Sequence, residues 1–307
     1  MRILITGSRG FLGSTFAAFA TAQGHDILGL GRSAQPPPGW PGQYAWTDVA
    51  HADLSPLVNG FRPDLVFHGA GSASVGGSFQ SPLDDLRASV YTFANTLEGI
   101  RRSNHRPVVL FPSSAAVYGH PSRLPVCEDD PTRPISPYGF HKLAAEQLGR
   151  EYAACYGLRV VLGRIFSVIG PRQRRLLLWE LFQQFTSPDP GVTLEGTGEE
   201  TRDFLYAEDA VGIFLRLGEA FSRRTEGECV AVNVGSGTET PVHRLVELTA
   251  RLLGSDKPVR YQTHGRLGDP SRWVADTTTL HARGGEFACR SLEATVSISL
   301  KAWQNSL

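Results

Sequence analysis

The chain has 307 residues, of which 41% are hydrophobic and 20% charged, and its formal net charge is zero. A chain of this size can bury a substantial core, and with its balanced charge no net basic field draws it to nucleic acid or to an anionic membrane. No apolar run approaches the roughly 18 residues of a membrane span, no leader pattern opens the chain, and the four cysteines form no C-x-x-C pair. We therefore expect a soluble, cytoplasmic protein with no disulfide, metal site or nucleic-acid partner.

The first half of the sequence alternates short apolar strands with helical patterns. Strands are expected at residues 3–5, 26–30, 65–67, 108–111 and 159–166, and helices at 11–22, 82–104 and 138–156. Such alternation is typical of a parallel sheet with helices on both faces. The sequence therefore predicts an α/β fold with a Rossmann-type, doubly wound parallel sheet.

A glycine-rich turn joins the first predicted strand to the first predicted helix. Its glycines permit a tight turn and close approach of the backbone to a pyrophosphate, which then lies at the positive end of the helix. The G-x-x-G-x-x-G spacing differs from the commoner G-x-G-x-x-G, so a purely structural turn is the alternative. The residues expected to bind a dinucleotide here are Gly7, Arg9, Gly10, Phe11, Leu12 and Gly13.

The end of the second strand bears on which dinucleotide is bound. An Asp or Glu about 20 residues after the glycine turn normally holds the ribose hydroxyls of NAD. Here the strand ends in Gly-Arg-Ser, and Arg32 can bind a phosphate through two hydrogen bonds, with Arg9 within reach of the same group. This favours NADP(H), with NAD(H) possible, unless both arginines are merely solvated. Asp48, at the end of the next short strand, is expected at the adenine amino group.

The regular alternation of strands and helices ends after about residue 170. Pro and Gly interrupt the pattern at 188–191 and 196–198. Helices are expected at 203–217 and 241–253, and a strand at 230–234. We expect residues 1–166 to form the dinucleotide-binding domain. Residues 167–307 are expected to form mainly a smaller C-terminal substrate-binding lobe, interleaved with the last strands of the sheet.

One Tyr–Lys pair in the helix expected at 138–156 is unusual for this composition. Lys142 is one of three lysines among 30 basic residues, and it follows Tyr138 by four positions. Residues at this spacing lie on one helical face, and the cation is expected to lower the pKa of the phenol. Tyr138 is therefore a candidate proton donor and acceptor, the alternative being an exposed Tyr over a Lys side chain.

With these motifs, the chain resembles the extended short-chain dehydrogenase/reductase family of nucleotide-sugar epimerases, dehydratases and 4-ketoreductases. Besides the glycine turn, the matching segments are 112–119, 136–142, 170–171, 201–204 and 266–269, which span nearly the whole chain. The resemblance implies that Tyr138 exchanges a proton with a sugar oxygen while a nicotinamide exchanges hydride at the same carbon. It implies that Lys142 holds the nicotinamide ribose and that Ser114 hydrogen-bonds the reacting oxygen.

The resemblance also implies a nucleoside-diphosphate sugar as the substrate. Arg202 and Arg266 are expected to clamp the diphosphate, which suits guanidinium groups, and Asp269 to hold the ribose. A surface ion pair is the alternative for each arginine. Ser167 stands where the family usually has an Asn that contacts the diphosphate. The remaining expected contacts are Ser72 and Ser114 for the substrate, and Val49 and Ala70 for the cofactor.

Departures from the family narrow the expected reaction. Ala115 and Ala116 replace the Asp-Glu pair of the 4,6-dehydratases, and Ala116 also replaces the Cys of GDP-fucose synthase-like enzymes. Since alanine cannot transfer a proton, neither dehydration nor the epimerisation next to the ketone is expected. The expected reaction is redox at a single carbon, C4 of the hexose. Galactose 4-epimerases have a Lys where Ala73 stands and an Asn where Ser89 stands.

Two reactions at C4 remain close alternatives. Reduction of a nucleoside-diphosphate 4-keto-(6-deoxy)hexose by NADPH is expected first. A 4-epimerase similar to UDP-glucose 4-epimerase, with a tightly bound nicotinamide, is the alternative. A non-catalytic NADP-sensing protein is a remote third, because such relatives typically lose the Tyr–Lys pair. The resemblance further implies a homodimer that pairs the helices expected at 82–104 and 138–156.

Overall fold

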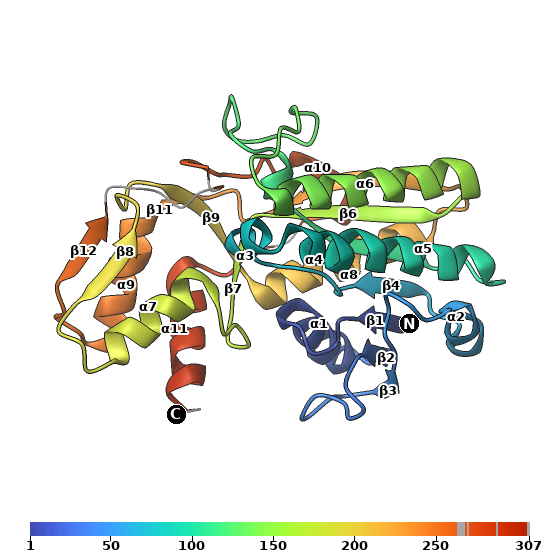
Figure 1. The fold of residues 1–307 in the computed structure, drawn as a ribbon, viewed down its shortest axis with the longest axis horizontal. Coiled ribbons are helices and arrows are strands. Elements are labelled where there is room, and N and C mark those ends of the chain that lie inside the picture. The colour runs from blue at the N-terminus through green and yellow to red at the C-terminus, as the bar shows by residue number, and fades with distance from the viewer. Residues whose placement is uncertain (263–267, 269, 287, 306–307) are drawn as a thin grey trace.

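The computed structural model describes residues 1–262, 268, 270–286 and 288–305. A seven-stranded sheet occupies its centre, and a smaller lobe lies to one side (Figure 1). The strands of the sheet, in spatial order, are β10 (Glu228–Val234), β6 (Arg159–Ile165), β5 (Val108–Ser114), β4 (Leu65–His68), β1 (Arg2–Thr6), β2 (Asp26–Gly31) and β3 (Gln43–Trp46). All neighbouring pairs are parallel, which confirms the predicted doubly wound α/β fold.

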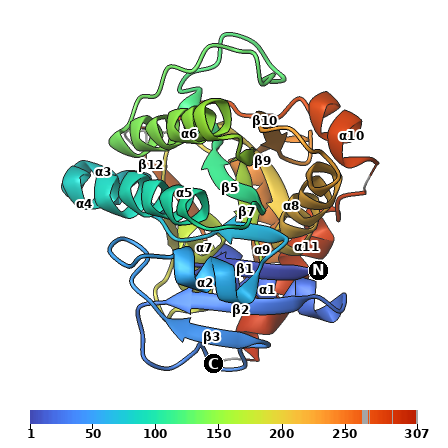
Figure 2. The same ribbon diagram turned by 90° about the vertical axis from the view of Figure 1, so that its right-hand side faces the viewer.

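Helices cover both faces of this sheet (Figure 2). One face carries α1 (Phe11–Ala22), α8 (Ala207–Ser222) and α10 (Thr278–Gly284), and the other carries α2 (Ser55–Phe61), α5 (Thr92–Arg102) and α6 (Pro137–Tyr156). Successive side chains of a strand point to opposite faces. Accordingly, Ile3 and Ile5 pack in the core under α1 and α8, whereas Leu4 packs in the core under α5.

The single helix predicted over residues 82–104 is built from several pieces. After α3 (Val75–Gln80), the chain forms α4 (Pro82–Leu86), a π-helical turn η1 (Arg87–Tyr91) and then α5. Apolar spacing alone does not distinguish an ordinary helical turn from a π turn, which adds one residue to it. In this turn Ser89 is buried, and its hydroxyl oxygen accepts a hydrogen bond from the backbone N–H of Ser72 at 3.4 Å.

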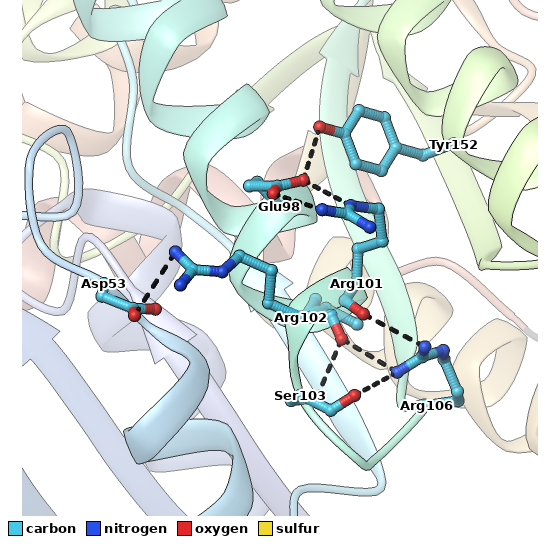
Figure 3. A network of polar contacts seen from close by, with 8 residues as sticks. Asp53, Glu98, Arg101, Arg102, Ser103, Arg106 and Tyr152 are labelled. Atoms are coloured by element: carbon cyan, nitrogen blue, oxygen red, sulfur yellow. Dashed lines mark hydrogen bonds and ion pairs between the residues drawn. The ribbon is translucent and has the colours of Figure 1, made fainter.

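Polar side chains hold the C-terminal end of α5 against α6 (Figure 3). Glu98 accepts two hydrogen bonds of 2.7 Å from Arg101 and a third from the Tyr152 hydroxyl of α6 at 3.2 Å. Arg106 donates to the backbone carbonyl of Arg101 at 3.1 Å. Because the last carbonyls of a helix lack partners within it, this cation completes the end of α5.

The smaller lobe contains three helices and two small sheets among the residues described. Its elements are α7 (Leu176–Thr186), α9 (Val242–Leu253), α11 (Leu292–Gln304), a sheet of β11 (Glu239–Pro241), β9 (Thr201–Tyr206) and β7 (Ser167–Ile169), and a pair of β12 (Val259–Gln262) and β8 (Val192–Glu195). Phe182 of α7 and Trp303 of α11 are buried against each other, 5.3 Å between ring centroids.

The prediction of a helix at 203–217 is wrong for its first four residues. Residues 203–206 belong to β9, and the helix that follows is α8. Strand β9 exists because it pairs with β7 and β11, which are distant in sequence, and local periodicity does not reveal such partners. The division of the chain into two domains at residue 166 stays a prediction, since β10 joins the main sheet from beyond that point.

Candidate active site

Helix α6 sets the positions of the predicted Tyr–Lys pair. The hydroxyl of Ser136 caps the helix by accepting a hydrogen bond from the backbone N–H of Gly139 at 3.2 Å, and proline fills the first helical position. Gly157, with a φ of 69°, ends the helix in the left-handed conformation. Tyr138 and Lys142 therefore stand one turn apart near its N-terminal end.

The structure brings Ser114, Tyr138 and Lys142 together at the C-terminal end of β5. Ser114 is the last residue of that strand, and its hydroxyl oxygen accepts a hydrogen bond from the backbone N–H of Ala116 at 3.1 Å. The Nζ of Lys142 lies 5.7 Å from the ring centroid of Tyr138 and donates to the backbone carbonyl of Pro112 at 2.9 Å. Ligands of open α/β sheets bind at this edge.

Burial dominates the protonation of both catalytic candidates. Burial raises the pKa of the Tyr138 phenol to about 12, and its interaction with the Ser114 side chain offsets only part of the rise. Burial also lowers the pKa of Lys142 to about 8, against the opposing charges of Asp85 and Glu146. The prediction that Lys142 gives Tyr138 a lowered pKa is therefore wrong for the protein alone, because desolvation outweighs the hydrogen bond with the Ser114 side chain that lowers this pKa.

The glycine-rich turn has the close backbone contacts that a pyrophosphate site needs. Gly7 has a φ of 67°, and a Cβ placed on it would lie 2.4 Å from the backbone of Gly69, which follows β4. A Cβ on Gly13 would lie 2.4 Å from the carbonyl oxygen of Gly7. Gly10 immediately precedes α1, so backbone N–H groups and the positive end of a 12-residue helix lie beside the turn. These residues fit a dinucleotide.

Other predicted cofactor residues lie around the same edge of the sheet. Arg9 donates to the carbonyl of Gln35 at 2.8 Å, which ties the glycine turn to the loop after β2. Arg32 is exposed directly after β2. A hydrogen bond from the backbone of Ala50 lowers the pKa of the Asp48 carboxyl, and the nearby charge of Arg32 lowers it further. Asp48 follows β3 by two residues and does not end it.

The remaining cofactor candidates differ in what they present to a ligand. Val49 is only 5% exposed and packs in the core, while its carbonyl accepts a hydrogen bond from Asn95 at 2.8 Å. Leu12, in the first turn of α1, is partly buried and packs against the core. The ring of Phe11 lies beside the backbone of Gly170. Ala70 donates its backbone N–H to the Thr6 hydroxyl at 3.0 Å, at the end of β4.

Besides Ser114, three predicted substrate residues are described: Arg202 and Ser167 lie in the smaller lobe, and Ser72 lies in the loop after β4. Arg202 of β9 donates to the carbonyl of Pro270 at 3.0 Å, and its guanidinium lies 5.7 Å from the ring centroid of Trp273. Ser167 begins β7, beside β9 in the three-stranded sheet. Ser72 is half-buried in the loop before α3. The other two predicted residues, Arg266 and Asp269, lie outside the described part of the chain.

Two buried polar pairs beside this site were not predicted. His141 of α6 contacts Asp85 of α4, and Glu146 of α6 contacts Arg164 of β6. The partners are 56 and 18 residues apart in sequence, so neither pair forms a local motif. Only the three-dimensional arrangement of α4, α6 and β6 reveals them.

Three further properties bear on the kind of site. Within the described ranges, no group of three or more His, Cys, Asp or Glu side chains could hold a metal ion. The four cysteines are free thiols. None of the helices described is both long and apolar enough to cross a bilayer.

Comparison with known protein sequences identifies the family. A model of the NAD dependent epimerase/dehydratase family matches residues 3–235. The UDP-glucose 4-epimerase of Mycolicibacterium smegmatis is 32% identical over 292 residues, which cover 91% of this chain and 90% of that protein. The GDP-6-deoxy-D-mannose reductase of Pseudomonas aeruginosa is 28% identical, covering 90% of this chain and 93% of that protein.

Solved structures agree over the full length of the chain. The UDP-N-acetylglucosamine 4-epimerase from Methanobrevibacter ruminantium superposes with a TM-score of 0.88 at 25% identity, covering 100% of this chain and 99% of that one. MoeE5 in complex with UDP-glucose and NAD also gives 0.88, at 27% identity and the same coverage. The chain is therefore an enzyme of the NAD dependent epimerase/dehydratase family, within the extended short-chain dehydrogenases/reductases, as its motifs predicted.

Proposed function

We propose that the protein is a 4-epimerase of a nucleoside-diphosphate hexose that works with a tightly bound nicotinamide dinucleotide. The single observation that carries this is the meeting of Ser114, Tyr138 and Lys142 at the sheet edge beside the glycine turn. The UDP-glucose 4-epimerase relative supports epimerisation over the reduction that the sequence favoured. Structural neighbours that bind NAD and UDP-sugars support the same ligand classes here.

Each of the three side chains has a separate task in this proposal. When bound, the nicotinamide would supply hydride exchange at C4 of the sugar. Tyr138 accepts the proton of the C4 hydroxyl as the carbonyl forms and returns it as the hydroxyl is restored. The hydroxyl of Ser114 orients the C4 oxygen towards the phenol. The ammonium of Lys142 favours the phenolate at the moment that Tyr138 must accept a proton, and it holds the nicotinamide ribose.

Neighbouring residues restrict the reaction to one carbon. Ala115 and Ala116 follow Ser114 in the short helix η2 (Ala115–Val117), and both are buried. A methyl group can neither donate nor accept a proton, so these positions cannot assist elimination of water across C5 and C6. The proposal therefore excludes dehydration by these two residues.

Reduction of a 4-keto sugar nucleotide is the second candidate, and one observation favours it. Arg32 stands exposed directly after β2, where a carboxylate would repel the extra phosphate of NADP. An exchangeable NADPH is what a reductase needs, since its cofactor leaves oxidised after each turnover. The reductase relative from Pseudomonas aeruginosa supports this candidate. A cofactor-sensing protein without catalysis is disfavoured because the catalytic side chains are present together.

We also propose that Arg202 and Arg266 hold the substrate diphosphate and that Asp269 holds the nucleotide ribose. Arg202 already lies over Trp273, and its fork of donors suits phosphate oxygens. The identity of the base and of the sugar is left open by these contacts.

A homodimer is part of the proposal. Four large apolar side chains are between 38% and 59% exposed on α3, α4, η1 and α6, which contact one another. They are Phe79, Leu83, Tyr91 and Phe140. Exposed apolar patches mark protein–protein or membrane interaction sites, so we infer that this one is an interaction surface. Leu83, Tyr91 and Phe140 lie within the ranges 82–104 and 138–156, whose helices are expected to pair with their symmetry mates.

The experiment that tests the function begins with the nucleotide carried through purification. Mass spectrometry after denaturation identifies it, and the protein is then incubated with UDP-glucose or UDP-galactose without added cofactor. Retained oxidised dinucleotide with interconversion of the two sugars supports the epimerase. A protein that takes up NADPH and consumes it only with a 4-keto sugar nucleotide supports the reductase. Absence of both reactions, with Tyr138→Phe as the background, would overturn the proposed function.

A further inference from the structure

A buried acid–imidazole pair lies beside the catalytic candidates. The Nδ1 of His141 is 2.5 Å from Oδ2 of Asp85, and their side chains are 16% and 3% exposed. The other carboxyl oxygen of Asp85, Oδ1, is buried without a hydrogen-bond partner within the part of the chain that the structure describes. A buried carboxylate with one oxygen unsatisfied is costly, so the position calls for an explanation beyond packing.

The location of the pair relates it to both members of the Tyr–Lys couple. His141 stands between them in α6, three residues after Tyr138 and one before Lys142. Asp85 reaches this helix from α4, which packs against α6. The charge of Asp85 acts on both groups and raises the pKa of each. For Lys142, it is the largest influence that opposes burial, ahead of Glu146.

We propose that Asp85, held in place by His141, is a positioning residue that keeps Lys142 protonated at neutral pH inside a buried site. This inference rests on the proposed function, in which Lys142 must be a cation beside the phenol of Tyr138. Without a compensating negative charge, a buried ammonium loses its proton as solvent is excluded. The sugar and the dinucleotide will exclude more solvent when they bind, so the need for that charge increases during turnover.

The other charged groups near Lys142 are accounted for by different contacts. Glu146, one turn further along α6, is neutralised by Arg164. Asp84 of α4 and Arg87 of η1 form an exposed ion pair, with side chains 75% and 63% exposed. His68 lies in the buried layer below, and burial lowers its pKa to about 3, so it stays neutral. Tyr91 of η1 is exposed on the outer surface. Asp85 is thus the buried acid near Lys142 that no cationic arginine or lysine neutralises among the residues described.

The direct test measures the protonation of Lys142 without relying on catalysis. The chain has three lysines, so protein labelled with ¹³C at the lysine ε carbon gives three NMR signals, which Lys257→Arg and Lys301→Arg assign. We expect the Lys142 signal of Asp85→Asn to titrate about one pH unit lower than in the wild type. The matched control is Asp84→Asn, which removes an exposed charge from the same helix and should leave the titration unchanged.

A second variant tests the inference if Asp85→Asn does not fold. His141→Leu removes the side chain that holds the Asp85 carboxyl in place, so the carboxyl is free to turn away from α6. The Lys142 titration should then move in the same direction, whereas His141→Gln, which keeps a donor, should preserve it. If Lys142 titrates alike in the wild type and in every folded Asp85 or His141 variant, the pair merely ties α4 to α6 and the inference is wrong.

The pH dependence of turnover separates this inference from the proposed function. In Asp85→Asn, the falling limb of the rate of sugar epimerisation, where Lys142 loses its proton, should move to lower pH by about one unit. A uniform loss of rate with an unmoved limb would contradict a positioning role. If the wild type shows no reaction with sugar nucleotides, the proposed function fails, while the NMR titration still decides whether Asp85 acts on Lys142.

Discussion

Glu146 and Arg164 form a bidentate ion pair inside the protein, directly behind the catalytic edge of the sheet. Arg164 donates from Nε and Nη2 to the two carboxylate oxygens at 3.0 and 2.8 Å, and the two side chains are 0% and 3% exposed. Ser113, the neighbour of Ser114, donates to the same carboxylate at 2.6 Å. The pair thus connects α6, β6 and the end of β5, the elements that carry the catalytic candidates.

Removing one member of this pair should therefore destabilise the fold. Glu146→Gln leaves the buried guanidinium without a counter-charge, and the expected loss is about 3–5 kcal/mol in the free energy of unfolding. Urea unfolding followed by circular dichroism measures it. Glu151→Gln, at an exposed position of the same helix, is the control and should change stability little. A loss below about 1 kcal/mol for Glu146→Gln would show that the pair contributes little to stability.

The catalytic role of the phenol is tested by Tyr138→Phe. The variant keeps the ring and its packing, so folding and dinucleotide binding should be preserved. Turnover should fall by about 10²–10⁴-fold, the usual contribution of a positioned acid or base. Steady-state assays with UDP-glucose, alongside cofactor binding by fluorescence, measure both properties. An active Phe variant would rule out Tyr138 as the group that transfers the proton.

The position of Arg32 predicts its effect on cofactor choice. Replacement by Glu removes a charge-assisted hydrogen bond to the extra phosphate and adds repulsion, so NADPH binding should weaken by about 10–100-fold. NADH binding should change little, and titration of each cofactor measures the ratio. Arg244→Gln is the control, because Arg244 is an exposed residue on α9 in the smaller lobe. Equal weakening of NADH and NADPH would mean that Arg32 does not contact the phosphate.

His68 makes stability depend on pH. Burial lowers its pKa from 6.5 to about 3 in the folded protein, with the nearby charge of Lys142 adding to the effect. Below about pH 6.5 the unfolded chain binds a proton that the folded protein does not, so stability falls as the pH falls towards about 3. Between about pH 7 and about pH 5 this group should cost about 2 kcal/mol.

The variant His68→Gln checks that contribution because glutamine does not titrate. Its stability should decline less than that of the wild type between about pH 7 and about pH 5 in urea unfolding experiments. His51→Gln, with a side chain that is 83% exposed in the wild type, should retain the full decline. Identical pH dependence in all three proteins would mean that His68 is protonated when folded.

The apolar patch on α3, α4, η1 and α6 predicts the effect of a charge on assembly. Leu83→Asp and Tyr91→Asp should each convert the proposed dimer to a monomer, because a carboxylate is costly to bury in an apolar interface. Light scattering after gel filtration measures the mass. Ile298→Asp, on α11 and 38% exposed in the wild type, should leave the dimer intact. A monomeric wild type would remove the basis for this prediction.

Local sequence signals predicted the fold well where the determinants are local. The bounds of α1 agree with the prediction because its turn and its apolar period lie within the segment itself. The prediction failed at residues 203–206, where pairing with β7 and β11 decides the structure. The prediction of a lowered pKa for Tyr138 was also wrong. Burial raises this pKa, and burial is a property of the packed protein that spacing along a helix does not reveal. The Asp85–His141 contact spans 56 residues and has no sequence signature.

Strand β10 has a practical consequence for dissecting this enzyme. It is the last strand of the main sheet beside β6, yet it comes from the part of the chain after residue 166. A fragment ending there would lose that strand together with α8, which shields one face. The hydrogen-bonding groups of β6 would then be open to other molecules, the usual route to edge-to-edge aggregation. Nucleotide binding is therefore best studied in the intact polypeptide, because a fragment of residues 1–166 would lack both β10 and α8.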